Sequence, residues 1–103
     1  LAHVGINCEN EVEAQRAAKT ICSLFDFDYK PGNSSIFAGS AVECMKSPYL
    51  GRNGHIAIGT NNLDRAIYHL SRQGVEFDES TRKPKAIYLN GEVGGFAIHL
   101  VER

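Results

Sequence analysis

Several features that would place a chain in a specialised class are missing from these 103 residues. No apolar run approaches the roughly 18 residues that a membrane-spanning helix needs. No basic segment followed by an apolar stretch indicates a secretory signal. The 11 basic and 12 acidic side chains nearly cancel, which argues against a nucleic-acid binder. We therefore expect a protein without membrane or nucleic-acid partners.

Cysteine is also scarce. Cys8, Cys22 and Cys44 are an odd set without a CxxC pair. This pattern excludes a disulfide framework or a zinc ribbon, and it predicts a reducing, cytoplasmic location. The sequence has no initiator Met, so we expect it to be a processed or excised piece of a longer polypeptide.

What the sequence does contain is an internal repeat. Residues 3–8 (HVGINC) correspond to residues 55–60 (HIAIGT), and a helical pattern follows each segment. Two apolar segments of the first half, 35–39 and 41–45, then match 86–90 and 97–101 of the second half. Weaker strands are expected near 27–30 and 75–77, each ahead of its pair. Each half thus reads as a strand, a helix and two or three strands.

The repeat predicts one domain over residues 1–103, built from module 1 (1–47), a linker (48–53) and module 2 (54–103). A module of about 50 residues buries too little surface to be stable alone, so the two should pack as a pseudo-symmetric pair. The first helix should turn one stripe inward, formed by Val12, Ala14, Ala17, Ala18, Ile21, Cys22 and Phe25. The second should begin at Asn61 or Asn62, end at Gly74, and bury Leu63, Ala66, Ile67 and Leu70.

Strand alternation places four polar side chains on the face opposite the aliphatic residues. His3, Glu43, His55 and His99 each come from a different predicted strand. Taken singly, each is more often a core or surface residue than a ligand. Together, in register across a repeat, they predict a site for a divalent metal, with Zn, Ni, Mn, Fe and Co left open.

The remaining candidates are weaker. Alternation turns Cys44 toward the helix, so it should be a core thiol rather than a nucleophile, and the same applies to Cys8. His69 should lie on the helix surface. Arg52 could bind a carboxylate or phosphate group, or it could be a solvated residue of a turn.

Three other features lie in the second half of the chain. Tyr88 and Asn90 could hydrogen-bond a ligand, depending on the strand register. The basic run 82–85 should be an exposed loop.

With this repeat and these four polar strand positions, the sequence resembles the vicinal oxygen chelate superfamily, which has the glyoxalase and bleomycin-resistance fold. Segment 55–67 (HIAIGTNNLDRAI) is similar to the opening of that family's second module. The resemblance implies an α+β fold of paired βαβββ modules, whose mixed sheet curls into a glyoxalase-like cup with the helices outside. It also implies metal ligands on the first and last strands of each module, at His3, Glu43, His55 and His99.

Segments 51–55 and 94–101 resemble more narrowly the domain fused behind the 2-dehydro-3-deoxyphosphogluconate aldolase barrel of some Gram-positive bacteria. Family enzymes usually carry Glu on the last strand, where this chain has His99, which puts a glyoxalase mechanism in doubt. The chain is also short, so a large glutathione adduct is not the expected substrate.

Two functions follow as expectations. The first is a metal-dependent lyase or isomerase that enolises a small 2-oxo or 2-hydroxy acid, with Glu43 as ligand and base and with Arg52 and Tyr88 contacting the substrate. The second is a non-catalytic module that binds a ligand or assembles subunits for a fused aldolase. In either case we expect a homo-oligomer, most simply a dimer.

Overall fold

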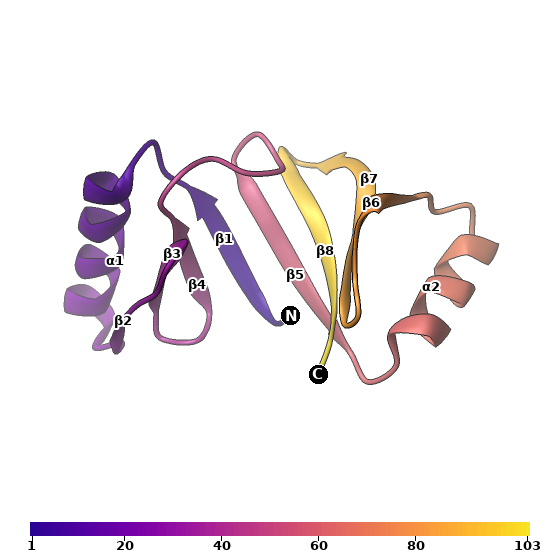
Figure 1. Ribbon diagram of the computed structural model, residues 1–103. Helices are drawn as coiled ribbons and strands as arrows, with labels where there is room; N and C mark the ends of the chain where they lie inside the picture. The colour runs from indigo at the N-terminus through magenta and orange to yellow at the C-terminus, as the bar shows by residue number, and fades with distance from the viewer.

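The computed structural model describes all 103 residues as one eight-stranded sheet and two helices (Figure 1). Module 1 contains β1 (His3–Asn7), α1 (Glu11–Phe25), β2 (Tyr29–Pro31), β3 (Ser35–Ala38) and β4 (Val42–Met45). Module 2 contains β5 (Gly54–Thr60), α2 (Leu63–Arg72), β6 (Phe77–Lys83), β7 (Ala86–Val93) and β8 (Phe96–Glu102). The predicted α+β class with two βαβββ modules is confirmed.

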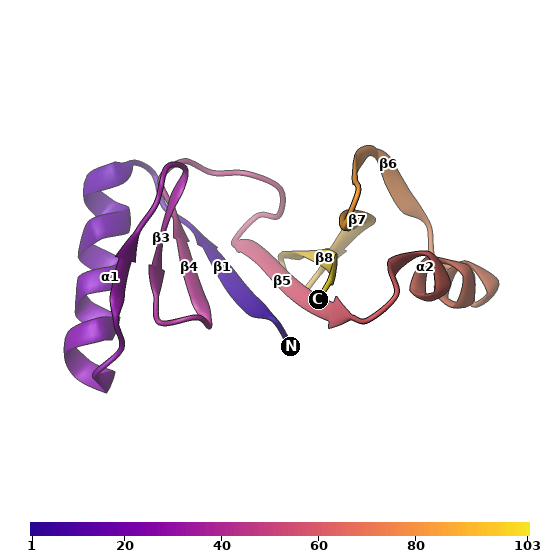
Figure 2. The same ribbon diagram turned by 60° about the horizontal axis from the view of Figure 1, so that its bottom comes forward.

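The strand order of the sheet is β2-β3-β4-β1-β5-β8-β7-β6. Each module pairs its first strand in parallel with its last, and β1 pairs antiparallel with β5 at the seam. The two halves of the order are therefore related by a pseudo-twofold axis at this seam. Figures 1 and 2 show β1 and β5 side by side at the centre, with the helices at the two ends.

The strand register reproduces the sequence repeat residue by residue. In module 1, Glu43 lies opposite Gly5 on one side and Phe37 on the other. In module 2, His99 lies between Ala57 and Tyr88 in the same way. Glu43 and His99 are therefore twofold-related positions, as the sequence alignment of the halves predicts.

Helix α1 packs on module 1 through small side chains. Asn10 caps its start by accepting from the Glu13 N–H at 2.9 Å, while Ala14 and Ala18 are fully buried against Ile36 and Cys44. The predicted stripe is too wide, because Val12 and Phe25 are 61% and 64% exposed. Val12 points away since it lies two positions from Ala14, about 200° around the helix. Phe25 is the last helical residue, and its ring lies 6.2 Å from that of Phe27 instead.

Helix α2 covers module 2 as predicted. Asn62 is the capping residue, its side chain accepting from the Arg65 N–H at 3.0 Å. The helix ends at Arg72, Gln73 caps it, and Gly74 follows with a φ of 91°, in the left-handed region that favours glycine. The core under this helix contains Leu63, Ile87 and Leu100, with Ala66, Ile67, Leu70 and Phe77 packed against it.

The outer strands differ most from the sequence prediction. Strand β2 begins two residues later than expected, at Tyr29, and β6 extends to Lys83 through the first half of the segment 82–85, which was expected to be a loop. Only Pro84 and Lys85 form the turn into β7. Because β6 is an edge strand, its charged side chains can reach solvent while its backbone pairs on one side.

The cysteines and His69 lie where the pattern predicts. Cys8 and Cys44 are buried in the core under α1, and burial raises the pKa of the Cys44 thiol to about 11. Cys44 is thus an inert core thiol. His69 is exposed on α2. Neither helix is long and apolar enough to cross a membrane.

Candidate metal centre

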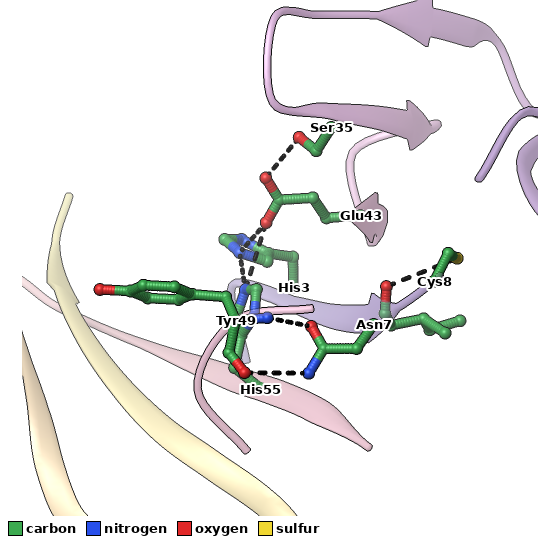
Figure 3. Close-up of polar contacts among 8 residues, drawn as sticks. His3, Asn7, Cys8, Ser35, Glu43, Tyr49 and His55 are labelled. Atoms are coloured by element: carbon green, nitrogen blue, oxygen red, sulfur yellow. Dashed lines mark hydrogen bonds and ion pairs between the residues drawn. The ribbon is translucent and has the colours of Figure 1, made fainter. Parts of the chain in front are cut away.

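Three of the four predicted ligands meet at the seam of the sheet (Figure 3). The Nε2 atoms of His3 and His55 are 3.1 Å apart, and each lies 3.2 Å from Oε1 of Glu43. The side chains are 19%, 3% and 16% exposed for His3, His55 and Glu43 respectively. Two imidazole nitrogens and one carboxylate oxygen thus form a nearly equilateral, largely buried triangle.

The antiparallel seam brings the two imidazoles together. His55 lies directly across from Gly5, and His3 lies across from Ala57. The imidazole of His55 occupies the space over Gly5, where an added Cβ would overlap the ring. Glycine is therefore required at position 5 for close approach rather than for backbone conformation. The Nδ1 atom of His55 is buried without a partner, so the ring is oriented by packing and by the contacts of its Nε2 with Glu43 and His3.

Glu43 is held as an ionised ligand. Burial by itself raises the pKa of its carboxyl, but hydrogen bonds from His3, His55 and Ser35 lower that pKa well below its ordinary value. The Ser35 hydroxyl donates to Oε2 at 2.6 Å and leaves Oε1 for the triangle. Ser35 is itself buried, with 7% of its surface exposed.

The donor set fits a divalent metal. Ligand atoms bound at about 2.0–2.2 Å from one ion stand roughly 3.0–3.6 Å apart, and the triangle has this spacing. Two histidines and one carboxylate also make up a ligand set that leaves coordination positions open for a small molecule. His3, His55 and Glu43 could therefore hold a metal ion without moving apart.

His99 lies beside this triangle but outside it. Its ring centroid is 5.9 Å from that of His55, and its ring stacks on Tyr88 at 4.1 Å with an interplanar angle of 4°. The Nδ1 atom of His99 is buried without a partner. Burial, followed by the nearby His55 and His3, lowers the pKa of His99 to about 4, so the ring is neutral at pH 7. Stacking on Tyr88 keeps His99 out of the group of three.

A cleft of about 570 Å³ opens over the triangle. Tyr88 lines it from β7, and Lys83 lines it from β6. Arg52 does not line the cleft: its guanidinium lies near Gly95, in the turn between β7 and β8. Asn90 also lies outside the cleft, because the register shifts between Tyr88 and Glu92.

Sequence reasoning missed Ser35, Asn7 and Tyr49. Ser35 fixes Glu43, whereas Asn7 hydrogen-bonds the linker that carries Tyr49 into the cleft. Alternation could have found Asn7, which shares a strand face with His3, but nothing in the sequence indicates that the linker folds over the cleft.

No protein-family profile matches the sequence, and neither does any curated protein. One similar structure is TnmS3, an antibiotic binding protein from Streptomyces sp. CB03234, with a TM-score of 0.39 and 17% identity over 99% of this chain and 96% of that one. Another is the genomically encoded fosfomycin resistance protein FosX from Listeria monocytogenes, with a TM-score of 0.37 and 17% identity over 100% and 90%. At this level of similarity, neither structure indicates what this chain binds.

Replacing Gly5 with Ala should displace the His55 ring and destabilise the fold by about 1–3 kcal/mol, because a buried Cβ and a ring cannot share one space. Urea denaturation measures this loss. Gly59→Ala is the matched control, since a Cβ there meets only the flexible side chain of Arg103. Equal stability of the two variants would contradict the close approach of His55 to Gly5.

Stability should fall as the pH drops from about 6.5 toward about 4. In this window the unfolded chain protonates His99, whose ordinary pKa is 6.5, while the folded protein does not. Glu43 adds a loss in the same direction only below its ordinary pKa of 4.5. Between pH 6.5 and 4.5, Tm should therefore depend less on pH in His99→Phe, which keeps a flat ring against Tyr88. Both proteins are measured with a chelator present, so that no bound metal contributes. If Tm changed with pH equally in the unaltered protein and in His99→Phe, His99 would not be the group responsible.

Proposed function

We propose that this protein is a metal-binding domain of the vicinal oxygen chelate type, which holds a small 2-oxo or 2-hydroxy acid in the cleft over His3, Glu43 and His55. The observation that carries the proposal is the triangle of donor atoms, 3.1–3.2 Å apart, at the seam between two βαβββ modules. The paired modules and the position of the donors on β1, β4 and β5 agree with the sequence resemblance to this superfamily.

Charge supports an anionic chelating ligand. The donor set contributes one negative charge from Glu43 and none from two neutral imidazoles, so a divalent ion would leave the site with one net positive charge. A carboxylate with an adjacent carbonyl or hydroxyl oxygen matches that charge and offers two ligand atoms. Lys83 adds a cation to the cleft wall, and a volume of about 570 Å³ suits a small molecule.

The residues around the triangle support binding more than turnover. A bound divalent ion would polarise a carbonyl oxygen of the ligand, but enolisation also needs a base whose pKa lies near neutrality. The pKa of Glu43 is held well below its ordinary value, and that of His99 is lowered to about 4. Both groups are therefore weak proton acceptors, so we assign Glu43 as a ligand. His99 forms the wall behind Tyr88 in this proposal, and Arg52 is not part of the site.

Other parts of the sequence prediction stay predictions. Attachment to an aldolase barrel, dimer formation and a cytoplasmic location rest on the sequence alone. A non-catalytic binding module is compatible with such an attachment, because the aldolase reaction requires a Schiff-base lysine in its own barrel.

After removal of metal and reloading with Zn, Ni, Mn, Fe or Co, the protein should bind about one equivalent of at least one ion. His55→Ala should reduce the bound metal below about a tenth of an equivalent, because it removes the most buried donor of the triangle. Elemental analysis after dialysis measures the content.

His69→Ala is the matched control, since His69 is exposed on α2 and should leave the metal content unchanged. His99→Ala should also retain the metal, because His99 lies outside the triangle. Unchanged metal in His55→Ala would contradict the ligand set, and absence of metal from the unaltered protein would contradict the site.

The metal-loaded protein should bind pyruvate without enolising it. In D₂O, proton NMR should show no loss of the methyl signal beyond that caused by the same concentration of free metal. Exchange that is faster with the protein and lost in Glu43→Gln at equal metal loading would instead establish Glu43 as a base and the protein as an enzyme.

A further inference from the structure

The linker between the modules supplies an aromatic side chain to the cleft. Tyr49 lies between β4 and β5 and is 54% exposed, yet its ring meets Tyr88 edge to face with centroids 5.9 Å apart. Tyr88 is fixed in turn by its stacking on His99 at 4.1 Å. Tyr49 and Tyr88 thus form an aromatic corner over the cleft, of which only Tyr88 belongs to a strand.

The side chain of Asn7 holds the linker in place (Figure 3). Its Nδ2 donates to the carbonyl oxygens of Gly51 and Tyr49 at 2.9 and 3.3 Å. Its Oδ1 accepts from the Tyr49 N–H at 3.2 Å, and the backbone N–H of Asn7 donates to Asn53 at 3.1 Å. Asn7 ends the strand that begins with His3, so β1 connects the metal triangle with the linker.

This set of bonds exists only once in the molecule. The twofold-related position to Asn7 is Gly59, which follows from the pairing of Asn7 with Met45 and of Gly59 with Val101. Glycine at position 59 has no side chain to hold a segment, so the asymmetry places the aromatic corner on one side of the seam.

We propose that Tyr49 is a specificity-determining residue and that Asn7 is its positioning residue. Together they make the cleft favour 2-hydroxy or 2-oxo acids that carry a flat, apolar substituent over acids that carry only a methyl group. The proposal rests on the proposed function, because it concerns the ligand of the same cleft. A corner of two aromatic rings offers such a substituent ring contacts that a methyl group cannot make in full.

The test compares lactate and mandelate, two 2-hydroxy acids with the same chelating group and either a methyl or a phenyl substituent. Each is titrated into the Co²⁺-loaded protein and followed by the visible absorption of the metal. The unaltered protein should prefer mandelate. Tyr49→Ala should weaken mandelate binding about fivefold, in line with the contribution of one aromatic contact, and should weaken lactate binding much less. Tyr49→Phe should keep the preference.

Asn7→Ala should lower the ratio of the affinity for mandelate to the affinity for lactate, as Tyr49→Ala does. Its affinity for Co²⁺ should be unchanged. Asn7→Asp, which keeps the acceptor for the Tyr49 N–H but loses the donor, should give an intermediate ratio. Tyr68→Ala is the control, since Tyr68 is an exposed tyrosine on α2 that contacts Arg72. The proposal would be overturned if Tyr49→Ala kept the affinity ratio of the unaltered protein, whether neither acid or both acids to the same extent bound more weakly.

A measurement on the metal-free protein separates this proposal from the metal site. The amide of Tyr49 should exchange with solvent about fivefold faster in Asn7→Ala than in the unaltered protein, because one hydrogen bond is lost. Equal exchange rates would overturn the role of Asn7. The unaltered protein could fail to bind Co²⁺ and still show slower exchange of the Tyr49 amide than Asn7→Ala. That result would contradict the proposed function but not the positioning of Tyr49 by Asn7.

Discussion

The antiparallel pairing of β1 with β5 is the constraint on which the rest of the structure depends. It joins the two modules into one sheet, and its register sets Gly5 opposite His55 and Ala57 opposite His3. Small residues at both positions leave room for the imidazoles to lie across the seam. A shift of one residue in this pairing would place the two imidazoles on opposite faces of the sheet. The site therefore exists only where both modules meet, because neither module alone carries both histidines.

The two modules share a fold, but they carry different side chains at related positions of the site. Glu43 accepts a hydrogen bond from the buried Ser35, whereas the position related to Ser35 in module 2 is Ala86. His99, the counterpart of Glu43, is held by stacking on Tyr88 rather than by a hydroxyl. Burial, followed by the nearby His55 and His3, keeps the His99 imidazole neutral, and three hydrogen-bond donors keep the Glu43 carboxylate ionised. These differences put the carboxylate of the donor triangle in module 1 and the aromatic wall of Tyr88 and His99 in module 2.

Much of the fold could be predicted from the sequence because it follows from local periodicity. The repeat of strand, helix and strands, the helix cap at Asn61 or Asn62 and the burial of Cys44 all depend on side chains within a few residues. The errors occur where contacts between elements decide. Phe25 fits the apolar stripe of α1 but lies exposed at its end, and Lys83 belongs to β6 because the backbone of that edge strand pairs with β7. Periodicity does not reveal how far a neighbouring element extends.

Which side chains of the site share a face can be read from the amino-acid sequence, because alternation along a strand is a property of the backbone. Which of them meet depends on how the strands pair. His3, Glu43 and His55 converge through the register of three strands, while His99 turns to Tyr88. The register depends on pairing between distant segments, and so does the path of the linker that Asn7 ties down over the cleft. Distances between strands and loops arise only when the modules pack, and no pattern along the chain encodes them directly.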